Sequence, residues 1–568
     1  MQGRWLATKR APQYGAVALA MVLVVAGGFL SSPRGTGSAS NGSVPTEGGS
    51  TAITTDLSPS APASITYGPY VTTETADFWG VSVDGTESPD NRIVASLLNA
   101  TPITTLRYGA DWSDQENWTY SSTFNGCFYS AGATAPPNCT AIQNNVTAFS
   151  TLCKWISSDY CILGLPAEIN NPSVATNMTH WLEQTDDWEP NCVAIGNEPS
   201  SWNNYDLPWS SWTSGHTRDP SATHLAETVS NYTDALRHIS SSACLIGLEA
   251  STNYVAGSSE ISDISSTVTN LSAYSFHLYP NSDCSGETVA QVLSLSHLTE
   301  IQTAYSDDFA PNAGGKPVSI HEFNLGINNC GSQIADYVGA VFDSATVAQA
   351  LALGIPDLTY FHFYCGGSQC MYDSTGSGTP TPTYSLYSGL YTHFYADIIH
   401  NATVSTGNPT FAVVGYKAGP PHYTLYSVLV SNAASATSEL VSMTGVLNST
   451  CQTSMEAYYQ TPGKGVWSYA LPSNDTIDLP DQSTAVVDWE CYSPPSPPPN
   501  ATASSLAKPS LSDESFNSVS TSLGLSAVAA KAGIALENGA YTTVVSIGRD
   551  AGDGPGAGQP SPAVARWS

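Results

Sequence analysis

The chain has 568 residues, which is enough for one barrel-sized domain, a smaller second domain and further terminal segments. It carries 16 Lys and Arg against 47 Asp and Glu, a formal net charge of −31. Because a strongly negative field repels polyanions, nucleic acid and tightly bound polyanions are excluded as partners. Only 11% of the residues are charged, while 10% are aromatic. Such a polar, weakly charged composition is typical of extracellular proteins that handle sugars.

Residues 1–30 have the pattern of an export signal. Arg4, Lys9 and Arg10 precede an apolar run at 15–30, which corresponds to the charged and apolar regions of a signal peptide. The run is long for a cleaved signal and short for a membrane-spanning helix. A signal peptide and a signal anchor both stay open, and we expect contact with a membrane only if residues 15–30 remain as an anchor. Residues 31–64 are predicted to be a linker.

Cysteines and glycosylation motifs also indicate export. The 12 cysteines are even in number and lack the CxxC spacing of a metal site. A secreted or lumen-facing glycoprotein with disulfide bonds is therefore expected. Candidate pairs are Cys284 with Cys330, Cys451 with Cys491, Cys127 with Cys139 and Cys365 with Cys370, although the sequence cannot fix the connectivity. The Asn-x-Ser/Thr motifs are at Asn41, Asn99, Asn117, Asn138, Asn145, Asn177, Asn231, Asn270, Asn401, Asn448, Asn474 and Asn500.

From residue 65 to 398, short β-type runs alternate with helix-length segments. Eight such alternations over about 300 residues predict an α/β fold, a (β/α)8 TIM barrel. Predicted helices lie at 93–98, 225–239, 289–305 and 334–353. The predicted strands are 78–83, 104–108, 160–165, 192–195, 244–248, 273–277, 318–321 and 358–362.

After the barrel the helical segments stop. Residues 399–491 hold β-type runs alone, at 411–416, 423–430, 439–443, 465–469 and 484–489. This texture predicts a C-terminal antiparallel β-sandwich domain. The Pro-rich run at 494–499 marks the start of a disordered tail, residues 492–568.

Two glutamates end β-type runs and point to the chemistry. Glu198 lies in Val193-Ala194-Ile195-Gly196-Asn197-Glu198-Pro199-Ser200, and Glu322 lies in Pro317-Val318-Ser319-Ile320-His321-Glu322-Phe323-Asn324. The carboxyl ends of barrel strands are where this fold keeps its catalytic groups. Glycosidic cleavage needs one carboxyl group as acid/base and one carboxylate as nucleophile. We interpret Glu198 as the acid/base and Glu322 as the nucleophile.

Four residues at other strand ends are predicted to support this pair. Asn197 is placed to hydrogen-bond the sugar 2-hydroxyl, and Arg107 to hold a catalytic carboxylate in its ionised form. Tyr279 is expected to orient the nucleophile, and His277 to contact substrate. The alternative for Arg107 is a structural ion pair, and the alternative for Tyr279 and His277 is plain core packing.

The segment around the last predicted strand supplies further candidates. His362, Gly367 and Tyr372 are predicted to form a wall of the sugar site, with a structural role as the alternative. His321 is interpreted as a supporting residue. Glu168 and Glu249 also stand near strand ends but lack an Asn neighbour, so neither is given a catalytic part.

Taken in order, these motifs resemble glycoside hydrolase family 79, which holds fungal β-glucuronidases and the heparanases. The resemblance covers roughly residues 65–490 and rests on five runs. It implies a retaining β-glucuronidase and a C-terminal β-domain that borrows a strand from residues 65–72. It also makes Gly367 and Tyr372 the nearest candidates to contact the uronic carboxylate. The runs are Leu106-Arg107-Tyr108-Gly109, Ile195 to Ser200, Ser275-Phe276-His277-Leu278-Tyr279-Pro280, His321-Glu322-Phe323-Asn324 and Tyr360-Phe361-His362.

Departures from the family pattern leave the sugar open. His321 stands where the family commonly has Ser or another small residue, Ala110 replaces a glycine, and the insertion Cys365 to Cys370 is unusual. A β-glucosidase, β-xylosidase or arabinofuranosidase and a non-catalytic carbohydrate-binding protein are the alternatives. No metal site or cofactor is expected, because the sequence has no metal-ligand spacing, phosphate loop or Gly-x-Ser-x-Gly elbow. The expected partner is a carbohydrate, and the oligomeric state is left open.

Overall fold

The computed structural model describes most of residues 62–491, together with 534–537 and 540–543. The residues of 62–491 outside the description are 74–76, 84–90, 110–115, 120–124, 129–138, 157–159, 203–204, 207–219, 241, 252–253, 329, 335, 366–369, 374–378, 395–396, 407, 419–423, 435–436, 447–455, 462–466 and 471–474. The predicted signal segment and residues 31–61 of the predicted linker lie outside the described residues, whereas Ala63 and Ser64 at the end of that linker belong to a strand, β1 (Ala63–Thr73). Within the predicted tail, β25 (Ile534–Glu537) and β26 (Ala540–Thr543) form an antiparallel hairpin.

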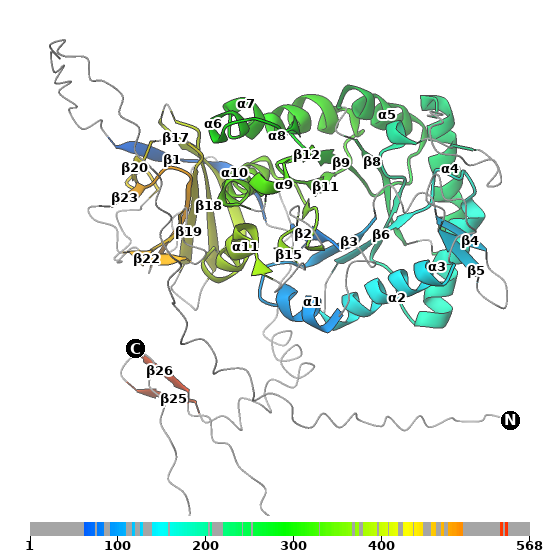
Figure 1. Cartoon of the computed structure of the whole chain (residues 1–568), viewed down its shortest axis with the longest axis horizontal. Helices are drawn as coiled ribbons and strands as arrows, with labels where there is room; N and C mark the ends of the chain where they lie inside the picture. Colours follow the sequence, from blue (N-terminus) through cyan, green and yellow to red (C-terminus); the bar gives the residue numbers. More distant parts are fainter. Residues whose placement is uncertain are drawn as a thin grey trace, which may run out of the picture. The chain divides into compact units, whose positions relative to one another are not determined.

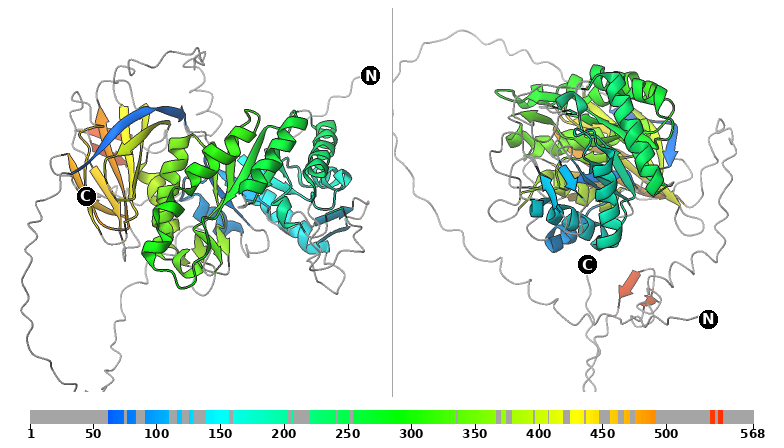
Figure 2. Two further views of the ribbon diagram at one scale, coloured as in Figure 1. Left: turned by 90° about the horizontal axis from the view of Figure 1, so that it is seen from above. Right: turned by 90° about the vertical axis from the view of Figure 1, so that its right-hand side faces the viewer.

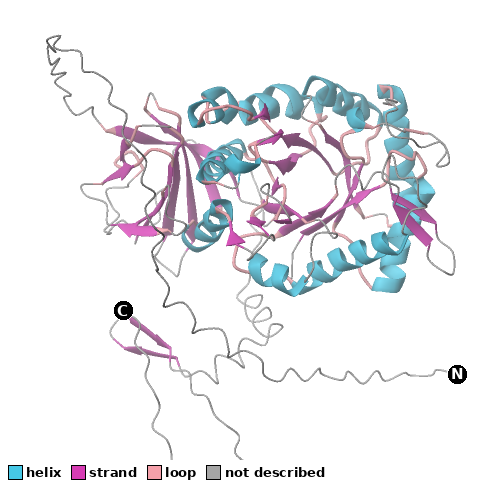
Figure 3. Ribbon diagram, in the orientation of Figure 1, coloured by secondary structure: helices cyan, strands magenta, loops and turns pink. Residues whose placement is uncertain are grey.

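Eight parallel strands close into a barrel, and helices surround them (Figures 1 and 3). The last strand pairs with the first, Leu358 opposite Trp79, which closes the ring. The predicted (β/α)8 barrel is confirmed, and each predicted strand is found. Going round the barrel, the strands are β2 (Trp79–Ser82), β3 (Thr105–Tyr108), β6 (Tyr160–Leu165), β7 (Cys192–Ile195), β8 (Cys244–Ala250), β9 (Ala273–Leu278), β11 (Val318–Phe323) and β13 (Leu358–Tyr360).

Local sequence signals set the helix ends. The Ser221 hydroxyl accepts the His224 amide at the start of α4, and Gly354 ends α10 with a φ of 72°. The described helices are α1 (Asn91–Leu98), α2 (Cys139–Trp155), α3 (Pro172–Asp186), α4 (Ala222–Ile239), α5 (Tyr254–Thr267), α6 (Val289–Val292), α7 (Leu295–Leu298), α8 (Glu300–Thr303), α9 (Gly331–Ile334), α10 (Tyr337–Leu353) and α11 (Pro382–His393), with the single turns η2 (Pro199–Ser201), η4 (Ala304–Phe309) and η5 (Ala310–Asn312). Short strands in the barrel loops are β4 (Glu116–Thr119), β5 (Asn125–Phe128), β10 (Asn281–Asp283), β12 (Gly326–Asn328), β14 (Tyr364–Cys365), β15 (Tyr372–Asp373) and β16 (Thr379–Pro380).

The C-terminal β-domain is a curled, mostly antiparallel sheet of nine strands. Side chains alternate along its strands: Tyr426, Val428 and Val430 of β19 enter the core of this sheet, whereas Leu429 faces the barrel. β1 precedes the barrel in sequence but pairs with β17 and β20 of this sheet (Figure 2, left, blue strand). In spatial order the strands are β22 (Ser468–Ala470), β21 (Glu456–Gln460), β24 (Ser483–Cys491), β19 (Thr424–Asn432), β18 (Thr410–Ala418), β17 (Ile398–Val404), β1 (Ala63–Thr73), β20 (Glu439–Ser442) and β23 (Thr476–Leu479).

Helix α10 joins the two parts. Nearly all of its residues are buried, and the helix packs against β17, β18 and β19 of the sheet and against the neighbouring helices α8 and α11. The Ser344 hydroxyl lies 2.6 Å from the Ser431 hydroxyl and 2.7 Å from that of Thr484, which pins the helix to β19 and β24. The barrel and the sheet therefore share a packed interface, which holds the helix that follows β11.

Disulfide bonds connect described cysteines in three places: Cys153–Cys161, Cys192–Cys244 and Cys284–Cys330. The predicted pair Cys284–Cys330 is confirmed, and the sequence did not suggest the other two. Cys370 and Cys491 are also disulfide-bonded. The remaining side chains of the predicted pairs lie outside the described part of the chain, namely Cys127, Cys139, Cys365 and Cys451. These bonds indicate an oxidising, extracellular-type environment.

Within the part of the chain that the structure describes, no helix has both the length and the apolar character to span a bilayer. The apolar run at 15–30 lies outside that part.

Candidate active site

The polar side chains predicted from strand ends gather at one rim of the barrel. Arg107 lies on β3, His277 on β9 and Glu322 on β11, while Asn197 and Glu198 directly follow β7. All barrel strands run in the same direction, so their carboxyl ends meet at this rim. The local sequence thus brings together groups that are far apart in the chain.

The turn that carries Glu198 is held from several sides. Gly196 has a φ of 88°, and a Cβ atom there would lie 2.9 Å from the Trp202 ring. The Trp202 indole N–H donates to the Asn197 carbonyl at 2.8 Å, and the Glu198 amide donates to the Glu249 carbonyl at 2.8 Å. Glu198 itself has a φ of 44°, which is unfavourable for a residue with a side chain. The surrounding contacts stabilise this conformation and aim the side chain into the site.

Glu322 is buried and has a partner at each carboxylate oxygen. Arg107 Nη1 donates to Oε1 at 2.8 Å, and the Tyr279 hydroxyl donates to Oε2 at 2.8 Å. Only 7% of the Glu322 side chain is exposed. These two donors fix the orientation of the Glu322 carboxyl group.

Arg107 is the hub of the site and is fully buried. Its Nε and Nη2 donate to the two oxygens of Glu249, both at 2.8 Å, as a bidentate pair. Nη2 also donates to Asn197 Oδ1 at 2.8 Å, and Nη1 donates to the Ser82 hydroxyl at 3.2 Å and the Gly109 carbonyl at 3.0 Å. Burial alone would lower the pKa of Arg107, but Glu249 and Glu322 outweigh it and raise the pKa.

Glu198 and His277 form a coupled pair. His277 Nδ1 lies 2.7 Å from Glu198 Oε1 and 3.5 Å from Glu322 Oε2. Burial raises the pKa of Glu198, but the His277 hydrogen bond and charge outweigh it, so the net shift is downward. Burial lowers the pKa of His277, and Glu322 and Glu198 outweigh it, so the net shift is upward. These two directions favour an imidazolium at His277 beside a carboxylate at Glu198.

The two glutamates converge. One carboxylate oxygen of Glu198, one of Glu322 and a ring nitrogen of His277 all lie within 4.8 Å of one another. Two carboxylates and an imidazole are also ligand types that a divalent cation accepts. Hydrogen bonds from Arg107 and Tyr279 already occupy the oxygens of Glu322, so this group needs no ion to account for its arrangement.

The segment after β13 is less closely tied to the glutamates. His362 is largely buried, and burial, with the charge of Arg107, lowers its pKa to about 3. Among the described atoms its Nδ1 has no hydrogen-bond partner. The Tyr372 ring packs edge-on against Tyr384 of α11, with ring centroids 5.9 Å apart. Gly367 lies outside the described residues.

Sequence reasoning missed the part that Glu249 plays. This residue is 1% exposed, binds Arg107 through both oxygens and accepts from His321 Nδ1 at 2.8 Å. Burial would raise the pKa of Glu249, but Arg107 and His321 lower it strongly. The available signal was a glutamate at the end of a β-type run, the same signal that identified Glu322.

No protein-family model matches the chain, and no curated protein matches it. Several solved structures match the chain. A family 51 α-L-arabinofuranosidase from Bifidobacterium longum aligns with a TM-score of 0.55 and 13% identity, over 75% of this chain and 99% of that chain. An α-L-arabinofuranosidase from Thermotoga maritima gives a TM-score of 0.55 and 13% identity, over 75% and 100%. A family 44 endoglucanase from Clostridium acetobutylium gives 0.54 and 11%, over 76% and 99%.

At this level of identity the likeness establishes the fold. Over about three quarters of its length, the chain shares its fold with a family 51 α-L-arabinofuranosidase and a family 44 endoglucanase. These matches give no assignment to family 79.

Proposed function

We propose that the protein is a secreted retaining glycoside hydrolase with Glu198 as acid/base and Glu322 as nucleophile. The observation that carries the proposal is the convergence of the two carboxylates, whose donor atoms lie within 4.8 Å of each other and of His277. Retaining enzymes hold their carboxyl groups about 5–5.5 Å apart, whereas inverting enzymes need about 6.5–9.5 Å to admit a water molecule. Oxygen atoms of Glu198 and Glu322 that lie within 4.8 Å of each other leave less room than an inverting enzyme needs for its water molecule, so the geometry favours double displacement.

In the first step, Glu322 attacks the anomeric carbon while Glu198 gives a proton to the leaving glycosidic oxygen. The C–O bond to the aglycone breaks, and a glycosyl ester forms on Glu322. In the second step, Glu198 takes a proton from water, the water oxygen attacks the anomeric carbon, and Glu322 leaves. Two inversions restore the original configuration. Asn197, fixed by Arg107 Nη2, is positioned to hydrogen-bond the sugar 2-hydroxyl.

His277 manages the proton of the acid/base. In the free protein the shared proton rests mainly on the imidazole, 2.7 Å from Glu198 Oε1. When the glycosidic oxygen approaches, this proton passes through Glu198 to the leaving group. The arrangement lets a glutamate that is ionised at rest act as a general acid.

The sugar that we propose is glucuronic acid in β linkage, cleaved from glycans or small glucuronides. This proposal rests on the resemblance of the ordered motifs to family 79. The net charge of −31 disfavours sulfated, heparan-type substrates. A second candidate, arabinofuranosidase activity, is favoured by the structural likeness to the family 51 enzymes. Export is supported by the disulfides and by exposed glycosylation motifs at Asn99, Asn231 and Asn270.

A panel of aryl glycosides tests the proposal. We expect release of the aryl group from the β-glucuronide; release from the α-L-arabinofuranoside instead would transfer the assignment to the second candidate. Glu322→Gln should abolish turnover, and Glu198→Ala should be rescued by azide or by activated aryl leaving groups. Glu168→Gln is the matched control, because Glu168 is another buried glutamate just beyond a barrel strand. Wild-type activity in both Glu198 and Glu322 variants would refute the assignment.

A further inference from the structure

A row of alternating charges runs from the nucleophile through the barrel interior. Arg107 follows Glu322 at 2.8 Å, Glu249 follows Arg107 at 2.8 Å, and His321 Nδ1 follows Glu249 at 2.8 Å. His321 Nε2 then lies 3.5 Å from Asp357 Oδ2. Their side chains are 0–7% exposed. Buried charges in such number are costly unless each one is paired.

A bulge in β11 places two neighbouring residues in this row. The pairing register with β9 shifts between Ile320 and Glu322, and the pairing with β13 shifts between Ile320 and Phe323. In a regular strand, consecutive side chains point to opposite faces, so one of His321 and Glu322 would face away from the barrel axis. The bulge re-aims the strand so that both side chains join the row.

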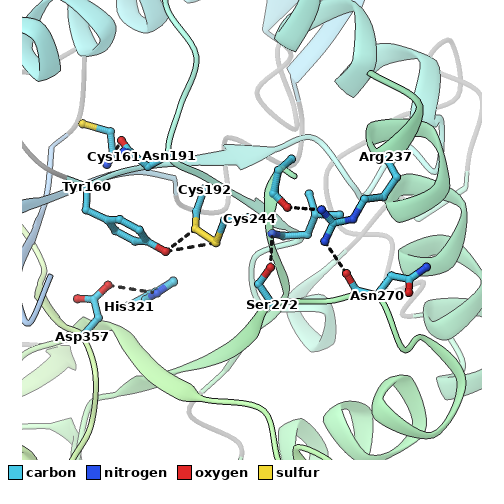
Figure 4. Close-up of a disulfide and its surroundings, with 12 residues drawn as sticks. Tyr160, Cys161, Asn191, Cys192, Arg237, Cys244, Asn270, Ser272, His321 and Asp357 are labelled. Atoms are coloured by element: carbon cyan, nitrogen blue, oxygen red, sulfur yellow. Dashed lines mark hydrogen bonds and ion pairs between the residues drawn. A yellow bond between two sulfur atoms is a disulfide. The ribbon is translucent and has the colours of Figure 1, made fainter. Parts of the chain in front are cut away.

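The end of the row at His321 and Asp357 lies near the Cys192–Cys244 disulfide. Figure 4 shows His321 facing Asp357, next to Tyr160, whose hydroxyl points to the Cys192–Cys244 bond. This hydroxyl lies 3.2 Å from Cys244 Sγ and also contacts Cys192 Sγ. Asp357 Oδ1 accepts from the Thr359 hydroxyl at 3.0 Å. Asp357 is therefore held in place below His321.

A proton on His321 reduces the excess of negative charge in the row. When its three carboxyl groups are ionised, the row has one permanent cation, Arg107, and a proton on His321 changes the net charge of the row from −2 to −1. Burial outweighs the contacts with His321 and Thr359 and raises the pKa of Asp357. Burial would lower the pKa of His321, but its contacts with Asp357 and Glu249 outweigh it and raise the pKa. Other titratable groups that interact with the row are Glu198 after β7, His277 on β9, Tyr279 after β9, His362 after β13, Tyr160 on β6 and, through Tyr160, Asp77 before β2.

We propose that Glu249 and His321 are positioning residues that fix the Arg107 guanidinium and divide its charge between Glu249 and the nucleophile Glu322. Glu249 grips Nε and Nη2 and thereby directs Nη1 toward Glu322. Protonated His321 offsets the charge of Glu249, so that Arg107 retains its attraction for Glu322. The inference rests on the proposed function, because it assumes that Glu322 is the nucleophile.

Two substitutions should move the pH dependence of kcat/KM in opposite directions. His321→Gln removes a cation but keeps an N–H donor for Glu249, so Arg107 is drawn toward Glu249. We expect the acidic limb to move up by about one pH unit. Glu249→Gln removes the competing carboxylate at nearly constant shape, so the acidic limb should move down by about one unit. In each variant we expect kcat to fall about tenfold to hundredfold, because the guanidinium is less well fixed.

The matched control is His400→Gln. His400 is a buried histidine of β17, in the C-terminal sheet, with Nδ1 3.3 Å from the Gly68 carbonyl. Its replacement tests the general cost of removing a buried imidazole, and its acidic limb should coincide with that of the wild type. If the limbs of His321→Gln and Glu249→Gln stay in place or move together, Glu249 and His321 only support the fold and the proposal is wrong.

Nitrogen NMR of the imidazoles tests the charge of the row without turnover. The His321 signal is identified by its loss in His321→Gln. In the wild type it should be that of an imidazolium at neutral pH, and its titration should move to lower pH in Asp357→Asn. A neutral His321 at neutral pH would overturn the proposal. If no glycoside is hydrolysed, the proposed function fails, while this titration still reports whether the row is charged as inferred.

Discussion

Replacing Arg107 by Lys separates the charge of this residue from its geometry. Arg107 makes six hydrogen bonds to five residues through three nitrogen atoms. A Lys ammonium keeps the charge but has three N–H donors on one atom. It cannot reach Glu249, Asn197 and Glu322 from three directions at once. At least half of the contacts are therefore lost, and the bidentate pair with Glu249 is lost in any placement.

The magnitude follows from these contacts. A hydrogen bond to a charged group contributes about 1.5–3 kcal/mol. Loss of one such bond to Glu322 and misplacement of Asn197 should raise the activation barrier by about 3 kcal/mol, which is roughly a hundredfold in kcat. Leaving part of the Glu249 charge uncompensated should lower the free energy of unfolding by about 3 kcal/mol.

The assay is the hydrolysis of an activated aryl glycoside, with denaturant unfolding measured on the same preparations. Arg237→Lys is the control. Arg237 on α4 donates to the carbonyls of Ala243 and Asn270, which precede β8 and β9 at the end of the barrel opposite the site, so kcat should stay at the wild-type value. If Arg107→Lys turned over within threefold of the wild type, the guanidinium fork would have no part in positioning the nucleophile, and the reasoning would be refuted.

Three further predictions concern the acid/base, a buried acid and a disulfide. His277→Asn should move the alkaline limb of kcat/KM toward acid, because the proton held by the raised pKa of His277 is lost; an unmoved limb would show that His277 does not supply it. Burial raises the pKa of Asp343 from 3.8 to about 8, so its protonated form stabilises the fold below about pH 4 and this contribution declines as the pH approaches 8. Asp343→Asn should remove a decline of up to about 1.4 kcal/mol per pH unit in the free energy of unfolding, and equal slopes in both proteins would contradict this. Replacing Cys192 and Cys244 by Ser frees a loop with a sequence separation of 52 residues, which should lower the free energy of unfolding by about 4 kcal/mol in denaturant titrations; no change would contradict the bond.

The main features of the site could be predicted because they follow strand periodicity. Glu198 and Glu322 each end an apolar run, and parallel strands in a barrel bring such ends to one rim. The same logic predicted that Arg107, His277 and Tyr279 would lie near them, and the structure brings all five together. The roles of these residues in catalysis remain proposals.

The contacts of Glu249 with Arg107 and His321 could not be predicted from the sequence, because they depend on the register in which the barrel strands pair. The pairing of Glu249 with Arg107 and His321 depends on where β8 and β11 shift their registers, at Ile246–Glu249 and at Ile320–Glu322. In a buried parallel strand both faces are apolar, so the sequence shows a continuous apolar run instead of an alternation of apolar and polar residues. A bulge inside such a strand therefore leaves no visible change in the sequence pattern. The Cys192–Cys244 bond has the same origin, because these residues become neighbours only when β7 and β8 are paired in register.

The role of Glu322 as the nucleophile can be tested directly by trapping the covalent intermediate. An activated 2-deoxy-2-fluoro derivative of the preferred sugar should slow the second step and trap the glycosyl-enzyme, whose site can be found by peptide mass spectrometry. We expect one sugar per chain, on the peptide that holds Glu322, and release of the label with recovery of activity. A label on Glu198 or Glu249, or complete inactivation with no covalent sugar on the chain, would contradict the assignment.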